Sequence, residues 1–180
     1  MSDQDTPAAI VVMGVSGSGK TVVGEALAEQ FGWRLLEADD FHPQANVDKM
    51  ASGIPLGDAD RWPWLDAIGT AIRDTDGGVI ATCSALRRVY RERLAEAAGR
   101  PITFLFLDGA RETLASRIGG RTGHFMPASL LDSQFATLEP PDADEPAIRL
   151  SVEPPVATVV ANARDALAAR GLIPEPTKNA

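Results

Sequence analysis

Residues 14–21 constrain the fold of this chain more than any other stretch. They read Gly-Val-Ser-Gly-Ser-Gly-Lys-Thr and match the pattern G-x-x-x-x-G-K-[ST]. A continuously apolar run, 9–13, precedes them, and an amphipathic stretch, 20–31, follows. Short apolar β-branched runs are typical of strands buried on both faces of a parallel sheet. A strand, a glycine-rich turn and a helix in this order predict a binding site for the phosphates of a nucleoside triphosphate.

Each residue type in this loop has a predicted role. Glycines let the backbone curl so that N–H groups point at phosphate oxygens, and the helix that follows adds the positive end of its dipole. Lys20 is predicted to reach the terminal phosphates, and the Thr21 hydroxyl to ligate magnesium. The predicted ATP-binding residues of the loop are Gly14, Val15, Ser16, Gly17, Ser18, Gly19, Lys20 and Thr21. The motif by itself leaves the phosphate acceptor open.

Apolar runs alternate with amphipathic stretches along the rest of the chain. Further strands are predicted at 33–36, 79–82, 102–107 and 147–152, and further helices at 43–50, 60–73, 86–97, 110–118, 128–138 and 156–167. This alternation predicts crossover connections and a parallel sheet with helices on both faces. We therefore expect a three-layer α/β chain with about five parallel strands.

The expected organisation is one domain at 9–171, between flexible tails at 1–8 and 172–180. Glycines at 119, 120 and 123 favour local mobility, and the acidic, proline-rich stretch 139–146 is expected to be a connector.

Composition limits the classes of function. The chain has 180 residues, of which 44% are hydrophobic and 23% charged, as in one soluble globular domain. A formal charge of -8 repels nucleic-acid backbones, so we expect no nucleic-acid partner. No stretch reaches the roughly 18 apolar residues of a membrane span, and the polar N-terminus lacks the features of a signal peptide. The single cysteine, Cys83, fits a cytoplasmic location and is expected to serve packing.

An acidic cluster follows the second predicted strand. Glu37, Asp39 and Asp40 lie where the carboxyl ends of parallel strands face the ligand crevice. A carboxylate there can hold magnesium through water or accept a proton from an attacking hydroxyl. A solvated acidic loop or a helix cap is the alternative at this point.

Several longer blocks carry a resemblance to a known family. They are EADDFHPQANVDKMASGIPL, DRWPWL, CSAL with Tyr90 and Arg91, RTGHFMP, and SQFATLEPP, in this order. With the phosphate loop they resemble gluconate kinase of the small P-loop type, from about residue 10 to residue 168. Members are similar in fold to adenylate and shikimate kinases, so the resemblance implies the three-layer P-loop kinase fold. It also implies that 9–171 is a kinase domain with an acceptor-binding segment at about 40–75 and a small lid at about 117–137. The resemblance implies ATP-dependent phosphorylation of D-gluconate at the 6-hydroxyl to 6-phospho-D-gluconate, which feeds the pentose phosphate pathway.

The resemblance also implies roles for single residues. Asp39 is expected to orient and deprotonate the sugar hydroxyl, and Glu37, where related sequences usually have Asp, to hold a magnesium-bound water. Arg117 and Arg121 match the arginines of the lid and are expected to bind ATP. The implied catalytic set is Asp39, Lys20 and Arg121. The implied substrate-binding residues are Asp39, His42, Lys49, Arg61, Arg87, Arg91 and His124.

Other functions remain open at this stage. The same scaffold could phosphorylate another small hydroxy-acid such as shikimate, although the DDFHP and CSAL blocks do not fit that enzyme. A nucleotide-dependent regulator without turnover is a second alternative, against which Asp39, Lys20 and the lid arginines argue. The expected partners are ATP with magnesium and D-gluconate, without a membrane, in a homodimer as is usual for the family. Trp62 and Trp64 are expected to anchor a helix to the core.

Overall fold

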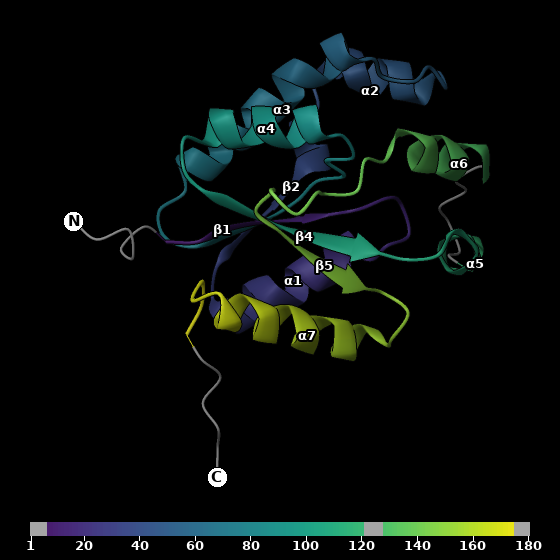
Figure 1. The fold of residues 1–180 in the computed structure, drawn as a ribbon. Coiled ribbons are helices and arrows are strands. Elements are labelled where there is room, and N and C mark those ends of the chain that lie inside the picture. The colour runs from purple at the N-terminus through teal and green to yellow at the C-terminus, as the bar shows by residue number, and fades with distance from the viewer. Residues whose placement is uncertain (1–6, 121–127, 175–180) are drawn as a thin grey trace.

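Five parallel strands form the centre of the computed structural model, which describes residues 7–120 and 128–174 (Figure 1). The strands are β1 (Ala9–Met13), β2 (Arg34–Glu37), β3 (Val79–Thr82), β4 (Ile102–Asp108) and β5 (Ala147–Ser151). Their order across the sheet is β2-β3-β1-β4-β5, and each neighbouring pair is parallel. The expected fold class is therefore confirmed.

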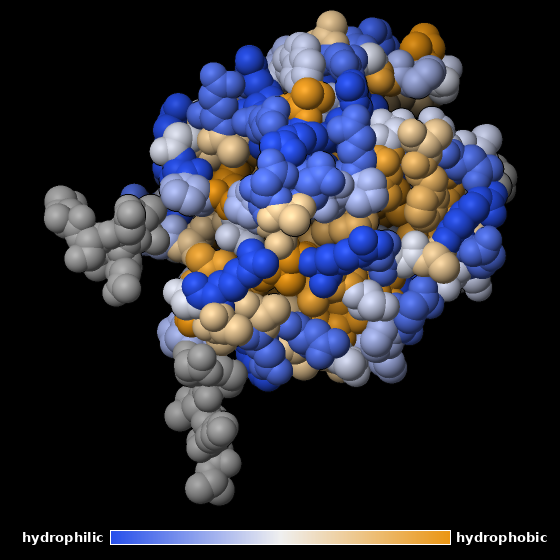
Figure 2. Space-filling view, in the orientation of Figure 1, coloured by the Kyte–Doolittle hydropathy of each residue, from blue (hydrophilic) through white to orange (hydrophobic). Residues whose placement is uncertain are grey.

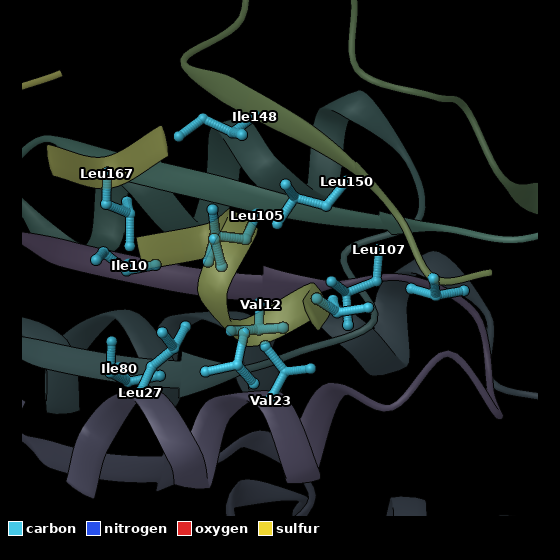
Figure 3. Packing of buried hydrophobic residues seen from close by; sticks show 14 of the residues in the cluster. Ile10, Val12, Val23, Leu27, Ile80, Leu105, Leu107, Ile148, Leu150 and Leu167 are labelled. Atoms are coloured by element: carbon cyan, nitrogen blue, oxygen red, sulfur yellow. The ribbon is translucent and has the colours of Figure 1, made fainter. Parts of the chain in front are cut away.

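Alternating side chains of the strands pack into two cores, one on each face of the sheet. Ile10, Val12 and Leu105 belong to the core that α1 (Lys20–Phe31) and α7 (Val156–Ala169) cover (Figure 3). Val11, Met13, Phe104 and Phe106 face the opposite core, which α3 (Asp58–Arg73) and α4 (Arg88–Ala98) cover. Since β1 and β3 are buried along their whole length, they read as continuous apolar runs.

The remaining helices gather toward the end of the sheet to which β4 and β5 point (Figure 1). A 3-10 turn, η1 (Ala38–Phe41), and α2 (Gln44–Ala51) follow β2, and they form the predicted acceptor-binding segment together with α3. Helices α5 (Arg111–Gly119) and α6 (Ala128–Thr137) follow β4. None of the helices in the described parts of the chain has the length and apolar character needed to cross a membrane.

Three boundaries differ from the prediction for identifiable reasons. Helix α3 begins two residues early, at Asp58, because the Asp60 carboxylate accepts the Gly57 N–H at 2.9 Å and caps the first turn. Helix α4 begins two residues late, at Arg88, because Arg87, the residue before it, has an extended backbone with φ -105° and ψ 147°. The predicted tail 172–180 begins too early, since Ile173 is buried in the core.

The connector 139–146 lies against α4 and is held there by ion pairs. Hydrophilic side chains gather on this side of the molecule (Figure 2). Arg88 pairs with Asp144 at 2.8 Å, and Arg91 donates to both carboxylate oxygens of Glu145 at 2.7 and 3.0 Å. The arginines of α4 are thus partly covered by the acids of the connector.

Arg91 is the exception among these arginines because it is buried. Its side chain is 2% exposed, that of Glu145 is 7% exposed, and its remaining donor reaches the Ala85 carbonyl at 2.9 Å. The Arg91 guanidinium holds the pKa of the Glu145 carboxyl below its usual range. This arrangement does not fit the predicted role of Arg91 in binding the acceptor. We interpret Arg91 as a structural residue that holds the turn at Ala85.

Arg91→Ala should therefore destabilise the fold strongly. Removing one partner of a buried pair leaves an uncompensated charge, which costs about 3–5 kcal/mol of unfolding free energy. Arg93→Ala is the matched control on the same helix, since Arg93 and Asp66 form a pair whose side chains are 43% and 41% exposed. An exposed pair contributes about 0–1 kcal/mol. Urea denaturation measures both, and equal losses for the two variants would contradict this assignment.

Candidate active site

The loop after β1 curls back on itself and is tied to its neighbours by main-chain hydrogen bonds. The Val15 carbonyl accepts the Ser18 N–H at 3.3 Å and the Lys20 ammonium at 3.1 Å. The Gly14 N–H donates to the Ser84 carbonyl at 3.3 Å, which attaches the loop to the segment after β3. The predicted phosphate-binding residues therefore lie at the N-terminus of α1, where backbone N–H groups and the helix dipole favour an anion.

Two glycines are required for this curl. Gly14 has a φ of 149°, and a Cβ there would lie 2.8 Å from Ser18 Oγ and 2.9 Å from the Leu107 carbonyl oxygen. Gly17 has a φ of 79°, and a Cβ there would lie 2.9 Å from Ile118 of α5. Both positions combine a backbone conformation that other residues rarely adopt with a close approach.

A pocket of about 290 Å³ adjoins the loop on the side of α5 and α7. Gly17, Ser18 and Gly19 form one wall, and Val156 and Val159 of α7 form an apolar wall. Arg117 also lines the pocket and donates to the Val152 carbonyl at 2.6 Å. The structure thus places the predicted ATP-binding Arg117 next to the loop, beside an apolar surface suited to an aromatic base.

Glu37, at the carboxyl end of β2, and Thr21, in the first turn of α1, come together. Glu37 is paired in register with Thr82, and the hydroxyls of Thr82 and Thr21 both donate to Glu37 Oε2, the latter at 3.4 Å. Glu37 Oε1 is buried and has no hydrogen-bond partner among the described residues. A buried carboxylate oxygen next to a hydroxyl fits the oxygen coordination of magnesium and its bound waters. The two residues predicted to hold the metal are thus adjacent.

On the acceptor side, a stacked pair of rings supports the turn that carries Asp39. His42 stacks on Trp64 with ring centroids 4.3 Å apart and planes 10° apart. The Trp64 indole N–H donates to the Ala38 carbonyl at 2.7 Å and holds η1 against α3. Asp39 itself is exposed. Trp64 is buried, as predicted, and its contacts with His42 and Ala38 also support the acidic turn.

The environment of His42 keeps its imidazole neutral near pH 7. Burial lowers its pKa from the ordinary value of 6.5, the nearby Asp39 carboxylate opposes this shift, and Arg61 reinforces it. Asn46 Nδ2 lies 3.3 Å from His42 Nδ1. Because the folded pKa is below the unfolded one, the unfolded state binds the proton first, and stability falls as the pH drops below 6.5. A neutral imidazole can donate to or accept from a substrate hydroxyl.

The cations predicted to bind the acceptor differ in how far they are already paired. Lys49 forms an ion pair with Asp60 at 2.7 Å. Arg87 donates to Asp58 at 2.8 Å and to Glu139 at 3.3 Å. Among the described residues, Arg61 has no carboxylate partner.

Arg61 is instead held by weak contacts. Its guanidinium carbon lies 5.3 Å from the centre of the Tyr90 ring, and one terminal nitrogen is 3.4 Å from the Leu56 carbonyl. Its Nε is buried without a hydrogen-bond partner in the described structure. Of the three cations, Arg61 is therefore the one whose charge is available to a ligand.

Two predicted residues, Arg121 and His124, lie outside the described residues, so their roles stay predictions. The predicted lid at 117–137 is described only at its two ends. One polar contact to the phosphate loop was not predicted: Gln134 of α6 is hydrogen-bonded to Ser16. Gln134 belongs to the SQFATLEPP block, but no sequence signal indicates its partner.

Comparison with known proteins agrees with this geometry. Residues 10–141 match the AAA domain family model. The chain is 52% identical over 150 residues to a gluconokinase of Gluconobacter oxydans, covering 82% of this chain and 84% of the relative. It is 44% identical over 165 residues to the thermosensitive gluconokinase of Escherichia coli, covering 88% and 87%. The crystal structure of a gluconokinase from Sinorhizobium meliloti superposes with a TM-score of 0.85 at 48% identity, covering 92% of this chain and 94% of that one. This chain therefore belongs to the gluconokinase family of P-loop kinases.

Proposed function

We propose that this chain transfers the γ-phosphoryl group of ATP to the 6-hydroxyl of D-gluconate, giving 6-phospho-D-gluconate and ADP. The observation that carries the proposal is the meeting of three groups of side chains at one end of the sheet. These are the phosphate loop, the Glu37–Thr21 pair, and the turn with Asp39 and His42, where His42 also feels Arg61, which has no carboxylate partner among the described residues. The family membership supplies the identity of the acceptor.

On the donor side, the loop and α1 bind the phosphates and the pocket beside Arg117 takes the base. Lys20 neutralises charge that develops on the transferred group, since phosphoryl transfer depends mainly on positioning and electrostatic stabilisation. Thr21 and a water held by Glu37 would ligate magnesium, whose chemistry is to neutralise the β- and γ-phosphate oxygens. Arg121, matched to the lid of the family, is expected to add a second cation.

On the acceptor side, the two ends of gluconate need opposite chemistry. The carboxylate needs a cation, and we assign it to Arg61 because its planar donors can bind a carboxylate bidentately and no acid of the described structure occupies them. His42 and Lys49 offer polar partners to the intervening hydroxyls. Asp39 accepts the proton of the 6-hydroxyl while the hydroxyl oxygen bonds to the γ-phosphorus. The bond between the γ-phosphorus and the β-phosphate oxygen breaks, and ADP leaves.

The resemblance also leads us to propose a cytoplasmic homodimer. Dimers are usual in the family, and the single, buried Cys83 suits a reducing compartment. Light scattering on protein eluted from a size-exclusion column measures the mass in solution. A mass of one chain at all concentrations would contradict the dimer.

A coupled assay of ADP release tests the function directly. Purified protein is mixed with ATP and magnesium, and release is measured with gluconate, glucose, shikimate or no acceptor. Of these acceptors, we expect only gluconate to give ADP release. Turnover with shikimate in preference to gluconate would indicate the alternative kinase, and nucleotide binding without turnover on any acceptor would indicate a regulator.

Asp39→Asn should lower kcat by about 10²–10⁴, the range for loss of a general base, with a modest change in the gluconate KM. The matched control is Asp40→Asn, because Asp40 is the neighbouring exposed acid of the same turn. We expect that control to keep its kcat. Steady-state kinetics measure both variants, and an unchanged kcat in Asp39→Asn would remove Asp39 from the mechanism.

Arg61→Ala should raise the gluconate KM by about 10- to 100-fold, the value of a charge-assisted hydrogen bond, and leave the ATP KM near normal. The reason is that the carboxylate is bound equally in the ground and transition states. Arg73→Ala, an exposed arginine at the other end of α3, is the control. If the gluconate KM does not respond to Arg61→Ala, another cation holds the carboxylate.

A further inference from the structure

Gln134 binds one residue of the phosphate loop at two points. Its Oε1 accepts the Ser16 backbone N–H at 2.7 Å, and its Nε2 donates to Ser16 Oγ at 2.9 Å. The two residues are 118 positions apart in the sequence. Ser16 is the third residue of the loop, between the two glycines whose backbone conformations the curl requires.

These two hydrogen bonds determine how Ser16 can meet a ligand. Its backbone N–H donates to Gln134, so this amide is not available to a phosphate oxygen while that hydrogen bond is present. A serine hydroxyl has a single hydrogen and can accept from elsewhere. Because Gln134 donates into the oxygen, the hydroxyl hydrogen must point away from the amide group, and it remains available to an acceptor such as a phosphate oxygen.

The loop and α6 each have contacts besides the one with Gln134. The Val15 carbonyl closes the loop through Ser18 and Lys20. Helix α6 is held by buried Leu131 and by the pair between Asp132 and Arg111 of α5 at 2.5 Å. Because each element has contacts of its own, we interpret the Gln134 contact by its effect on Ser16.

We propose that Gln134 is a positioning residue for the nucleotide, which fixes Ser16 so that its hydroxyl donates to the phosphates of ATP. The inference rests on the proposed function only in taking ATP as the ligand of the loop. It assigns no contact between Gln134 and the substrate, and it concerns the donor side rather than the choice of acceptor.

Direct binding of a nucleotide tests this without turnover. A non-hydrolysable ATP analogue with magnesium is titrated calorimetrically into wild-type protein and variants, with no acceptor present. Gln134→Ala should weaken binding by about 5- to 50-fold, the value of two neutral hydrogen bonds. Gln30→Ala is the matched control, because Gln30 is exposed on α1 roughly 15 Å along the helix from Lys20. We expect it to bind normally.

Gln134→Glu separates positioning from a structural role. Its carboxylate can still accept the Ser16 N–H, but it also attracts the hydroxyl hydrogen and places a negative charge beside the phosphates. We expect a melting temperature close to wild type together with a loss of affinity at least as large as in Gln134→Ala. If the role of Gln134 were merely structural, a variant with a near-normal melting temperature would also have near-normal affinity for the nucleotide.

A double-mutant cycle with Ser16→Ala completes the test, and it holds even if one variant of Gln134 folds poorly. If Gln134 acts through Ser16, the combined variant loses less affinity than the two single losses together. Additive losses, or normal affinity in stable Gln134 variants while Lys20→Met loses binding, would overturn the inference and leave the proposed function intact. A wild-type protein that binds no nucleotide would overturn both.

Discussion

The parallel pairing of β1, β2 and β3 is the interaction on which the site depends. Thr82 lies in register with both Val12 of β1 and Glu37 of β2, so the carboxyl ends of the three strands lie side by side. Because parallel strands end at the same edge, segments distant in sequence deliver their functional groups to one place. The phosphate loop follows β1, the acidic turn follows β2, and the Ser84 carbonyl after β3 accepts the Gly14 N–H.

The ion pair between Arg91 of α4 and Glu145 of the connector supports this edge. Ala85 takes a left-handed backbone conformation that non-glycine residues rarely adopt, and it directly follows the residue that holds Gly14. Arg91 binds the Ala85 carbonyl and is neutralised in turn by Glu145 of the connector. The buried charge pair therefore stabilises a strained turn next to the nucleotide site, and this explains why an arginine is buried there at all.

Much of the fold could be predicted from the sequence because local pattern and burial agree. β1 and α1 have the predicted bounds, since the first is apolar throughout and the second begins at the loop motif. The start of α4 was predicted wrongly because Arg87, inside the predicted helix, is extended, and the spacing of apolar residues does not indicate this. Contacts between segments distant in the sequence leave no local signal either, so the sequence shows which arginines exist but not which acids neutralise them. Gln134 was missed because no local signal links residues 118 positions apart.

The position of the new phosphate on the product tests the central claim most directly. In our account Arg61 holds the carboxylate and Asp39 faces the hydroxyl at the far end, so only one hydroxyl of gluconate meets the γ-phosphate. Carbon-13 NMR of the product made from ATP and gluconate reports phosphorus coupling at the esterified carbon. The account predicts coupling at carbon 6 and its neighbour alone. Coupling at another hydroxyl-bearing carbon, or inorganic phosphate as the sole product, would contradict it.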